Sequence, residues 1–178
     1  LILRGGTVVD GTGAEPFAAD VVLGTGRILD VLRAGQRNVP QNVAIPELDV
    51  TGLLVSPGFI DIHSHSDFTL LVDPRAVSSI AQGVTLEVVG NCGHGCAPIF
   101  DPELVKSNIY GYHEDYGLDW QSMGQYLEHL EQAQPAVNAL SLVPNGNLRL
   151  AAAGLVDRPS SADELAHMEK LLQQSLEE

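Results

Sequence analysis

The stretch that decides the fold is GFIDIHSH at residues 58–65, an apolar and β-branched run that ends in two histidines. It predicts a buried β-strand over residues 60–65. Because side chains alternate between the two faces of a strand, Asp61, His63 and His65 should all project to one side. Two neighbouring imidazoles at a strand end are suited to holding a metal ion. The run therefore predicts part of a metal site.

A second apolar run, Val84–Val89, predicts the next strand and leads into GNCG at residues 90–93. The thiol of Cys92 thus follows one strand as the two histidines follow the other. A thiolate in this position could coordinate or bridge metal ions. We therefore expect His63, His65 and Cys92 to form one set of metal ligands.

Other interpretations of the same residues remain open. The two histidines could be hydrogen-bonded core or surface residues, and Cys92 could be a small buried hydrophobe. The run CGHGC, from Cys92 through His94 to Cys96, could be half of a structural zinc knuckle, but the second ligand pair that such a knuckle needs is missing from the sequence. If the histidines bind metal, Asp61 or Asp67 could accept a hydrogen bond from an imidazole and fix its tautomer.

The remaining polar candidates carry weaker signals. His129 and His167 fall on predicted helices beside charged residues and are expected to face solvent. His113 lies in a tyrosine-rich loop, and we assign it no role. Asn145-Gly146 follows the third predicted strand and is interpreted as a turn at the end where the metal site should lie.

Composition narrows the class of protein. The chain has 178 residues, of which 44% are hydrophobic, which excludes an intrinsically disordered chain. A formal charge of −14 argues against nucleic acid as a partner, because phosphate binding requires clustered Lys and Arg. No apolar run approaches the roughly 20 residues of a membrane span. Two closely spaced cysteines do not form a secreted disulfide framework, so we expect a reducing compartment, the cytoplasm.

The first part of the chain predicts a small all-β module. Short β-rich runs alternate with glycine-rich turn signals from residue 1 to about residue 53. The expected strands are Leu1–Leu3, Thr7–Val9, Val21–Leu23, Ile28–Leu32 and Leu53–Val55, with turns at Gly5-Gly6, Asp10-Gly11, Gly24-Thr25-Gly26 and Gly35. Residues 38–49, which include Pro40 and Pro46, are expected to run over the surface.

After Pro57 the pattern changes to alternating strands and helices, which predicts a parallel α/β sheet. The expected elements are a helix capped by Asp73 and ended by Gly83, the strand Val84–Val89, a long loop to Asp119, a helix capped by Asp119, the strand Val137–Val143, and a last helix begun by a Ser161/Glu164 capping box. Three parallel strands do not close a barrel and leave apolar edges exposed. We therefore expect this chain to be the N-terminal part of a longer protein, or to be completed by a second chain.

These motifs resemble a known family. The opening LRGGTVVDG at residues 3–11, the run SPGFIDIHSHSD at residues 56–67 and QGVT at residues 82–85 resemble the amidohydrolase superfamily. Within it, VGNCG at residues 89–93 followed by Ala97-Pro98, and later residues 138–149, resemble the D-aminoacylase (N-acyl-D-amino-acid deacylase) family. The family often has Gly-His-Gly before Leu-Arg, where this chain has PNGN, so the likeness implies no histidine ligand there.

The resemblance implies a fold and a set of metal ligands. The fold is α/β, with a small β-sandwich at residues 1–55 beside a (β/α)8 barrel, of which residues 56–178 would supply the first three βα units. One or two zinc ions are implied, held by His63 and His65 and by Cys92 as the cysteine that contacts both metal sites. The family's further histidines, and the aspartate that acts as general acid and base, would lie beyond Glu178.

The resemblance also implies an activity, the hydrolysis of the amide bond of N-acyl-D-amino acids to a carboxylate and a D-amino acid. The metal would polarise the carbonyl and activate water as nucleophile. No catalytic acid or base is expected within this chain, so alone it should be inactive. Two alternatives stay open, a dipeptidase for substrates with a C-terminal D-residue and a non-catalytic remnant that binds a metal or a partner.

Overall fold

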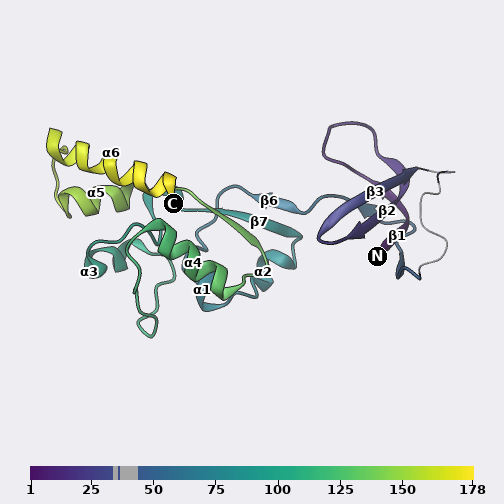
Figure 1. The fold of residues 1–178 in the computed structure, drawn as a ribbon, viewed down its shortest axis with the longest axis horizontal. Helices are drawn as coiled ribbons and strands as arrows, with labels where there is room; N and C mark the ends of the chain where they lie inside the picture. Colours follow the sequence, from purple (N-terminus) through teal and green to yellow (C-terminus); the bar gives the residue numbers. More distant parts are fainter. Residues whose placement is uncertain (34–35, 37–43) are drawn as a thin grey trace. The chain divides into compact units, whose positions relative to one another are not determined.

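The computed structural model of the chain describes residues 1–33, 36 and 44–178, and it divides into two compact units, Leu1–Pro57 and Gly58–Glu178. Figure 1 labels the elements of both units. The predicted turn at Gly35 and the first part of the predicted surface stretch, residues 38–43, lie outside the described residues.

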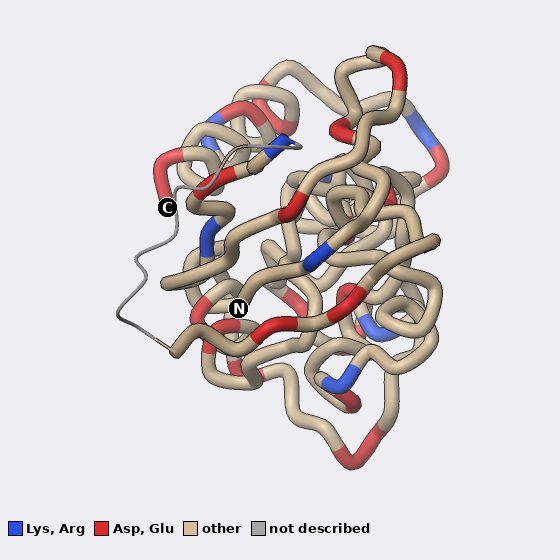
Figure 2. Tube along the Cα trace, turned by 90° about the vertical axis from the view of Figure 1, so that its right-hand side faces the viewer, with Lys and Arg blue, Asp and Glu red and all other residues tan. Residues whose placement is uncertain are grey.

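Acidic residues dominate the charge of the chain, with 23 Asp and Glu against nine Lys and Arg. Figure 2 shows the acidic positions spread along the Cα trace rather than gathered in one segment. Within the described part of the chain, no helix combines the length and the apolarity that crossing a bilayer requires.

The first unit is built on one five-stranded sheet. Its strands are β1 (Ile2–Val8), β2 (Phe17–Gly24), β3 (Arg27–Arg33), β4 (Glu47–Asp49) and β5 (Leu54–Val55). The order is β3-β2-β1-β4, and β5 also pairs with β1. The first three strands are antiparallel, whereas β4 and β5 run parallel to β1. The predicted turn at Gly24-Thr25-Gly26 is confirmed, with positive φ angles of 52° at Thr25 and 70° at Gly26.

Two predictions for this unit were wrong. Gly5-Gly6 is not a turn, because β1 continues through it with a register irregularity between Leu3 and Gly6. A Cβ atom at Gly6 would lie 2.7 Å from the Cγ2 atom of Val55, so the glycine permits the close approach of β5. The stretch before Val50 was predicted to run loosely over the surface, but Glu47–Asp49 pairs with β1 as β4.

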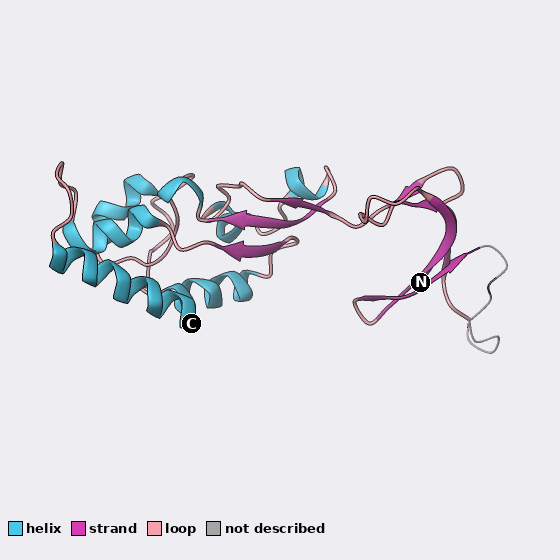
Figure 3. Cartoon of the chain, turned by 90° about the horizontal axis from the view of Figure 1, so that it is seen from above, coloured by secondary structure: helices cyan, strands magenta, loops and turns pink. Residues whose placement is uncertain are grey.

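The second unit contains the predicted parallel sheet. Its strands β6 (Phe59–Asp61), β7 (Val84–Val89) and β8 (Asn138–Ser141) are all parallel, in the order β6-β7-β8. Figure 3 shows these strands with the helices of the unit. The helices are α1 (Thr69–Val72), α2 (Val77–Ile80), α3 (Pro102–Val105), α4 (Met123–Ala133), α5 (Asn145–Ala153) and α6 (Ala162–Glu177), with 3-10 turns η1 (Asn91–Gly93) and η2 (Lys106–Asn108).

The helix boundaries confirm one predicted cap, correct two others and replace one predicted turn with a helix. The capping box of Ser161 and Glu164 opens α6 as predicted. The cap of α4 is Ser122 rather than Asp119, because Ser122 forms a full capping box with Gln125. The other two corrections are that α2 is a single turn that begins after Ala76 rather than at Asp73, and that the predicted turn Asn145-Gly146 is the start of α5.

The core of the second unit lies where α1, α4 and the long loop after β7 meet. Phe68, Ile99 and Tyr126 are fully buried there. Two polar groups in this core are satisfied by backbone carbonyls, since Trp120 Nε1 donates to Cys96 O at 2.7 Å and the Tyr126 hydroxyl donates to Asp67 O at 2.9 Å.

The first strand of this sheet is not buried, contrary to prediction. Phe59, Ile60 and Ile62 are 61%, 62% and 74% exposed. Only β7 pairs with β6 among the described strands. The expectation that an open three-stranded sheet leaves apolar residues exposed is therefore confirmed.

Candidate metal centre

The two histidines lie just past the end of β6. The strand was predicted to reach His65, but it ends at Asp61, where the Asp61 Oδ1 atom accepts a hydrogen bond from the backbone N–H of His63 at 3.1 Å. Pairing with β7 nevertheless continues, because Ser64 N–H donates to Val88 O at 3.0 Å. The imidazole rings of His63 and His65 lie with their centroids 5.5 Å apart and their planes at 66°.

Cys92 follows β7 in the 3-10 turn Asn91–Gly93. Its φ of 57° and ψ of 20° are left-handed, which is rare for a residue with a side chain. Gly90 makes the turn possible, since it has a φ of 80° and a Cβ atom there would lie 2.5 Å from Leu142 O. The turn brings Cys92 Sγ to 3.2 Å from His63 Nε2.

The sequence expectation that these three residues come together agrees with the geometry. One ligand atom each from His63, His65 and Cys92 lies within 4.8 Å of the others. His63 and Cys92 are exposed and His65 is half-buried, with a buried Nδ1 atom that has no hydrogen-bond partner among the described residues. Imidazole nitrogen and thiolate sulfur are the ligands that zinc prefers, and three protein ligands with an open fourth position are typical of catalytic zinc. The donor set fits a zinc ion.

The two aspartates predicted to orient the histidine rings are used differently. Asp61 accepts from the backbone of His63, and Asp67 Oδ1 accepts from Gly90 N–H at 2.7 Å. Burial raises the pKa of the Asp67 carboxyl above its ordinary value. In the described part of the chain neither carboxylate is hydrogen-bonded to an imidazole, and Asp67 instead ties the segment after β6 to the end of β7.

The sequence interpretation missed a buried carboxylate that is hydrogen-bonded to the segment carrying the histidines. Glu87 on β7 is 2% exposed and accepts hydrogen bonds from the hydroxyl groups of Ser64, Ser66 and Ser79. One signal was available, since Glu87 is the single charged residue in the apolar run Val84–Val89.

A buried asparagine, also missed, holds the loop that carries Cys92. Asn147 on α5 is fully buried, and its Nδ2 atom donates to Gly95 O at 2.9 Å and to Pro98 O at 3.2 Å. Its Oδ1 atom accepts from Asn108 Nδ2 at 2.8 Å, which also donates to Gly93 O at 3.2 Å. No local sequence pattern indicated this network, because its members are up to 52 residues apart.

The alternative zinc-knuckle interpretation finds no support in the geometry. Cys96 is 1% exposed, lies outside the group of three ligands, and has its pKa raised by burial, which favours the neutral thiol. His94 lies beside the centre, with its ring centroid 6.3 Å from that of His65 and 5.1 Å from that of Tyr110.

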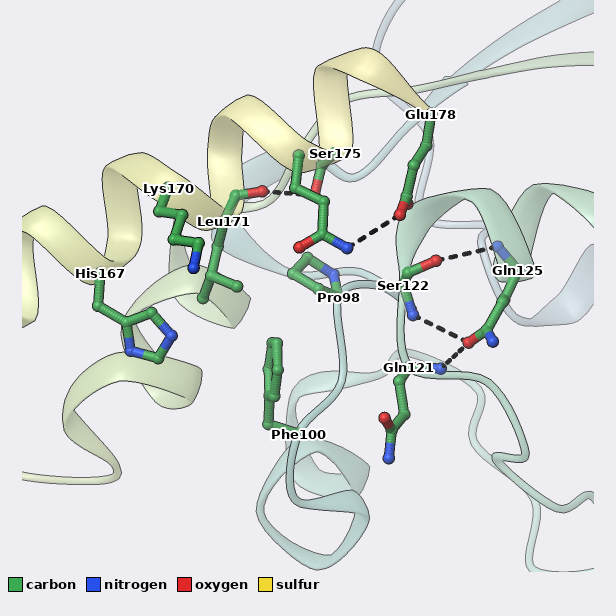
Figure 4. A pocket seen from close by; sticks show the side chains of 11 residues that line it. Pro98, Phe100, Gln121, Ser122, Gln125, His167, Lys170, Leu171, Ser175 and Glu178 are labelled. Carbon is green, nitrogen blue, oxygen red and sulfur yellow. Dashed lines mark hydrogen bonds between the residues drawn. The ribbon is translucent and has the colours of Figure 1, made fainter.

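The other three histidines lie apart from this group of ligands. His113 is exposed beside Asp115. His129 does not simply face solvent as predicted, because its ring packs against that of Trp120, with the centroids 4.9 Å apart and the planes at 49°. His167 is exposed on α6, as predicted, and lies at the pocket drawn in Figure 4.

That pocket is separate from the proposed ligands. It has a volume of about 520 Å³ and lies between α6, the start of α4 and the loop at Pro98–Phe100. Gln174 and Glu178 line it, and Glu178 also accepts a hydrogen bond from Gly124 N–H at 2.8 Å. The pocket contains none of the three proposed ligands.

Comparison with known proteins identifies the family of the chain. An amidohydrolase family model matches residues 47–178. The chain is 36% identical over 177 residues to N-acyl-D-glutamate deacylase and 32% identical over 177 residues to N-acyl-D-aspartate deacylase, both from Alcaligenes xylosoxydans xylosoxydans. These matches cover 99% of the chain but 35% and 34% of the two relatives.

Solved structures of related deacylases also match this chain over nearly its whole length. A D-aminoacylase crystal structure matches with a TM-score of 0.82 and 37% identity, over 99% of this chain and 36% of that one. N-acyl-D-glutamate deacylase from Bordetella bronchiseptica, complexed with zinc and a phosphonate inhibitor, matches with a TM-score of 0.85 and 34% identity, over the same shares.

This chain spans about a third of the length of these relatives. The expected fold class, the α/β fold of an amidohydrolase with part of a (β/α)8 barrel, is confirmed. The resemblance to the D-aminoacylase family is confirmed as well. The chain belongs to the amidohydrolase family.

Proposed function

We propose that this chain supplies metal ligands for the zinc-dependent hydrolysis of N-acyl-D-amino acids to a carboxylate and a D-amino acid. The convergence of His63, His65 and Cys92 within 4.8 Å is the observation that carries the proposal. Relatives named as deacylases of N-acyl-D-glutamate and N-acyl-D-aspartate support the substrate class. A relative complexed with zinc supports the metal.

The proposed ligands come from the ends of two neighbouring strands. His63 and His65, which follow β6, and Cys92, which follows β7, would hold zinc at the same end of the sheet. Bound zinc would polarise the scissile carbonyl and lower the pKa of water toward ~7. The residues of this chain fix the ligand positions.

The general acid and base is proposed to come from outside this chain. Among the described residues, no Asp or Glu side chain joins the three proposed ligands. We therefore propose that an aspartate in the part of the relatives' length that this chain does not span carries the proton to the leaving amine. The exposed apolar residues of β6 support completion of the barrel by further polypeptide or by a second chain.

A cytoplasmic location is part of the same proposal. Both cysteines are free, and Cys92 is exposed. A zinc-binding cysteine must be reduced and deprotonated. A reducing compartment would keep Cys92 in that form.

Metal analysis of the protein at its full natural length tests the ligands. We expect His63→Ala and Cys92→Ala to lose bound zinc, because each removes one of three protein ligands. His113→Ala is the matched control, since this histidine is exposed and lies in a loop beside Asp115, and it should retain zinc. Unchanged zinc content in both ligand variants would show that the assignment is wrong.

Stereochemistry needs a separate assay. The full-length protein should hydrolyse N-acetyl-D-amino acids, with acidic side chains included in the panel because two relatives are named for them. Hydrolysis confined to the L-isomers would overturn the proposed substrate class while leaving the zinc site intact.

A further inference from the structure

Glu87 is an acid in an unusual place. It lies in the middle of the sheet on β7, opposite Asp61 of β6, and only 2% of it is exposed. Among the described residues, no Lys or Arg side chain pairs with it. Its acceptors are instead filled by three hydroxyl groups, with Ser64 and Ser66 on Oε2 and Ser79 on Oε1.

A buried carboxylate at this position is costly for the sheet. Taking a charge out of water is unfavourable unless hydrogen bonds replace the lost solvation. The other residues of Val84–Val89 are uncharged, and a valine would pair and pack at this position without that cost. We therefore ask which part of the chain the hydrogen bonds of Glu87 hold in place.

Two of the three donors belong to the segment that carries the histidines. Ser64 lies between His63 and His65, and Ser66 follows directly. The Oγ atoms of the two serines are 3.0 Å apart, and Ser66 N–H approaches Ser64 Oγ at 3.3 Å. Ser64 and Ser66 flank His65 along the chain, and Ser64 directly follows His63. Hydrogen bonds from both serines to Glu87 therefore restrain the backbone segment that carries the two histidines.

We propose that Glu87 is a positioning residue for the zinc ligands, acting through Ser64 and Ser66. The inference rests on the proposed function, because it assigns Glu87 a role at the same metal site. Beyond the end of β6 at Asp61, the backbone of this segment bonds to β7 through Ser64 N–H and Val88 O, and the two serine side chains add bonds to Glu87. The Glu87 carboxylate restrains this segment through its hydrogen bonds to Ser64 and Ser66. Replacing a residue that orients metal ligands typically changes metal affinity by about 10–100-fold.

The test measures zinc affinity of the full-length protein by competition with a chelator. Glu87→Leu keeps the side chain similar in size but removes both acceptors, and we expect it to weaken zinc binding by about 10–100-fold. The double variant Ser64→Ala/Ser66→Ala should give a loss of similar size. Ser79→Ala is the matched control, because Ser79 donates to the same carboxylate from α2, away from the histidines, and it should stay within a few-fold of the parent.

Combining the variants separates positioning from general destabilisation. If Glu87 acts through the two serines, adding Glu87→Leu to the double variant should cause little further loss of zinc affinity. Cobalt substituted for zinc should show altered d–d and thiolate charge-transfer bands in Glu87→Leu, because the ligand geometry changes. A general loss of stability predicts additive losses and an unaltered spectrum of the cobalt-bound fraction.

Each outcome distinguishes this inference from the proposed function. Retention of parental zinc affinity by Ser64→Ala/Ser66→Ala, with zinc lost in His63→Ala, would overturn the role of Glu87 and leave the zinc site standing. Additive losses in the combined variant would overturn that role as well. If Glu87→Leu does not fold, the serine double variant and its cobalt spectrum still decide the question.

Discussion

At the residue scale, Cys92 combines a proposed chemical role with an unfavourable backbone. Its φ of 57° lies in the left-handed region, which disfavours every residue that has a Cβ atom. Glycine would adopt the same conformation freely. A thiol in this position therefore costs folding stability, and such local strain is found at functional sites.

This strain can be measured by comparing two variants that both lack the thiol. Without metal, we expect Cys92→Gly to have a free energy of unfolding about 1 kcal/mol higher than Cys92→Ala, because only alanine keeps a Cβ atom at positive φ. Denaturant unfolding in the presence of a chelator gives the difference. Equal stabilities of the two variants would show that the turn is not left-handed at this residue.

At the element scale, α6 begins with a charge arrangement that depends on pH. Arg158 donates to both carboxylate oxygens of Glu164, at 2.7 Å and 2.6 Å, and Glu164 also accepts from Ser161 N–H in the capping box. The Arg158 hydrogen bonds, followed by that of Ser161, lower the pKa of Glu164 to about 2 from 4.5. The ionised carboxylate thus favours the folded helix start.

The pH window follows from the direction of this shift. Because the folded pKa is lowered, the stabilisation is complete above pH 4.5 and is lost as the pH falls toward 2. We expect Glu164→Gln to lose less stability than the parent between pH 5 and pH 2, measured by denaturant unfolding at each pH. Arg158→Met should behave similarly because it removes the main cause. Parallel curves for parent and variants would contradict this account.

Sequence patterns predicted an element correctly where the residues that define it are close together in the sequence. The run Val84–Val89 is a strand with the predicted bounds, and the Ser161/Glu164 capping box opens α6. The predicted strand over residues 60–65 was too long, and Asn145-Gly146 is not a turn. At both places short-range hydrogen bonds mark the boundary, since Asp61 Oδ1 accepts from His63 N–H after β6 and Pro144 O accepts from Leu148 N–H at the start of α5.

The same distinction holds for the site. Three donor residues at two strand ends could be predicted because parallel strands end at one edge of a sheet. The hydrogen bonds that hold the segments carrying these donors could not be predicted in this way, because Glu87 and Asn147 bond to partners up to 23 and 52 residues away in the sequence. Only the three-dimensional arrangement shows which buried polar residue supports which proposed ligand.

At the scale of the whole molecule, β6 pairs with β7 alone among the described strands, and apolar side chains lie in and next to it. Phe59, Ile60 and Ile62 are all more than half exposed. Exposed apolar strands with free backbone groups promote association. These exposed apolar residues all lie in the second unit, Gly58–Glu178. The division into domains at residue 55 stays a prediction.

Produced as these 178 residues alone, the chain should self-associate and should not hydrolyse N-acyl-D-amino acids. We expect Ile60→Lys to shift it toward the monomer, because a charge on an edge strand opposes pairing. Leu155→Lys is the control, since Leu155 is 80% exposed but lies outside the sheet. Light scattering after size-exclusion chromatography gives the mass, and a monomer at every concentration would contradict the expectation.

The position of β1 in the first sheet also has a consequence for the order of events during translation. One side of β1 pairs with β2, which follows soon after it, but the other side pairs with β4 and β5, which end at Val55. A nascent chain could form the β1–β2–β3 meander early, yet β1 would keep an open side until residues 47–55 had left the ribosome. Although β1 is synthesised before the other strands of its sheet, it is thus among the last of them to be paired on both sides, and a ribosome stalled before Val55 would present an incomplete sheet to chaperones.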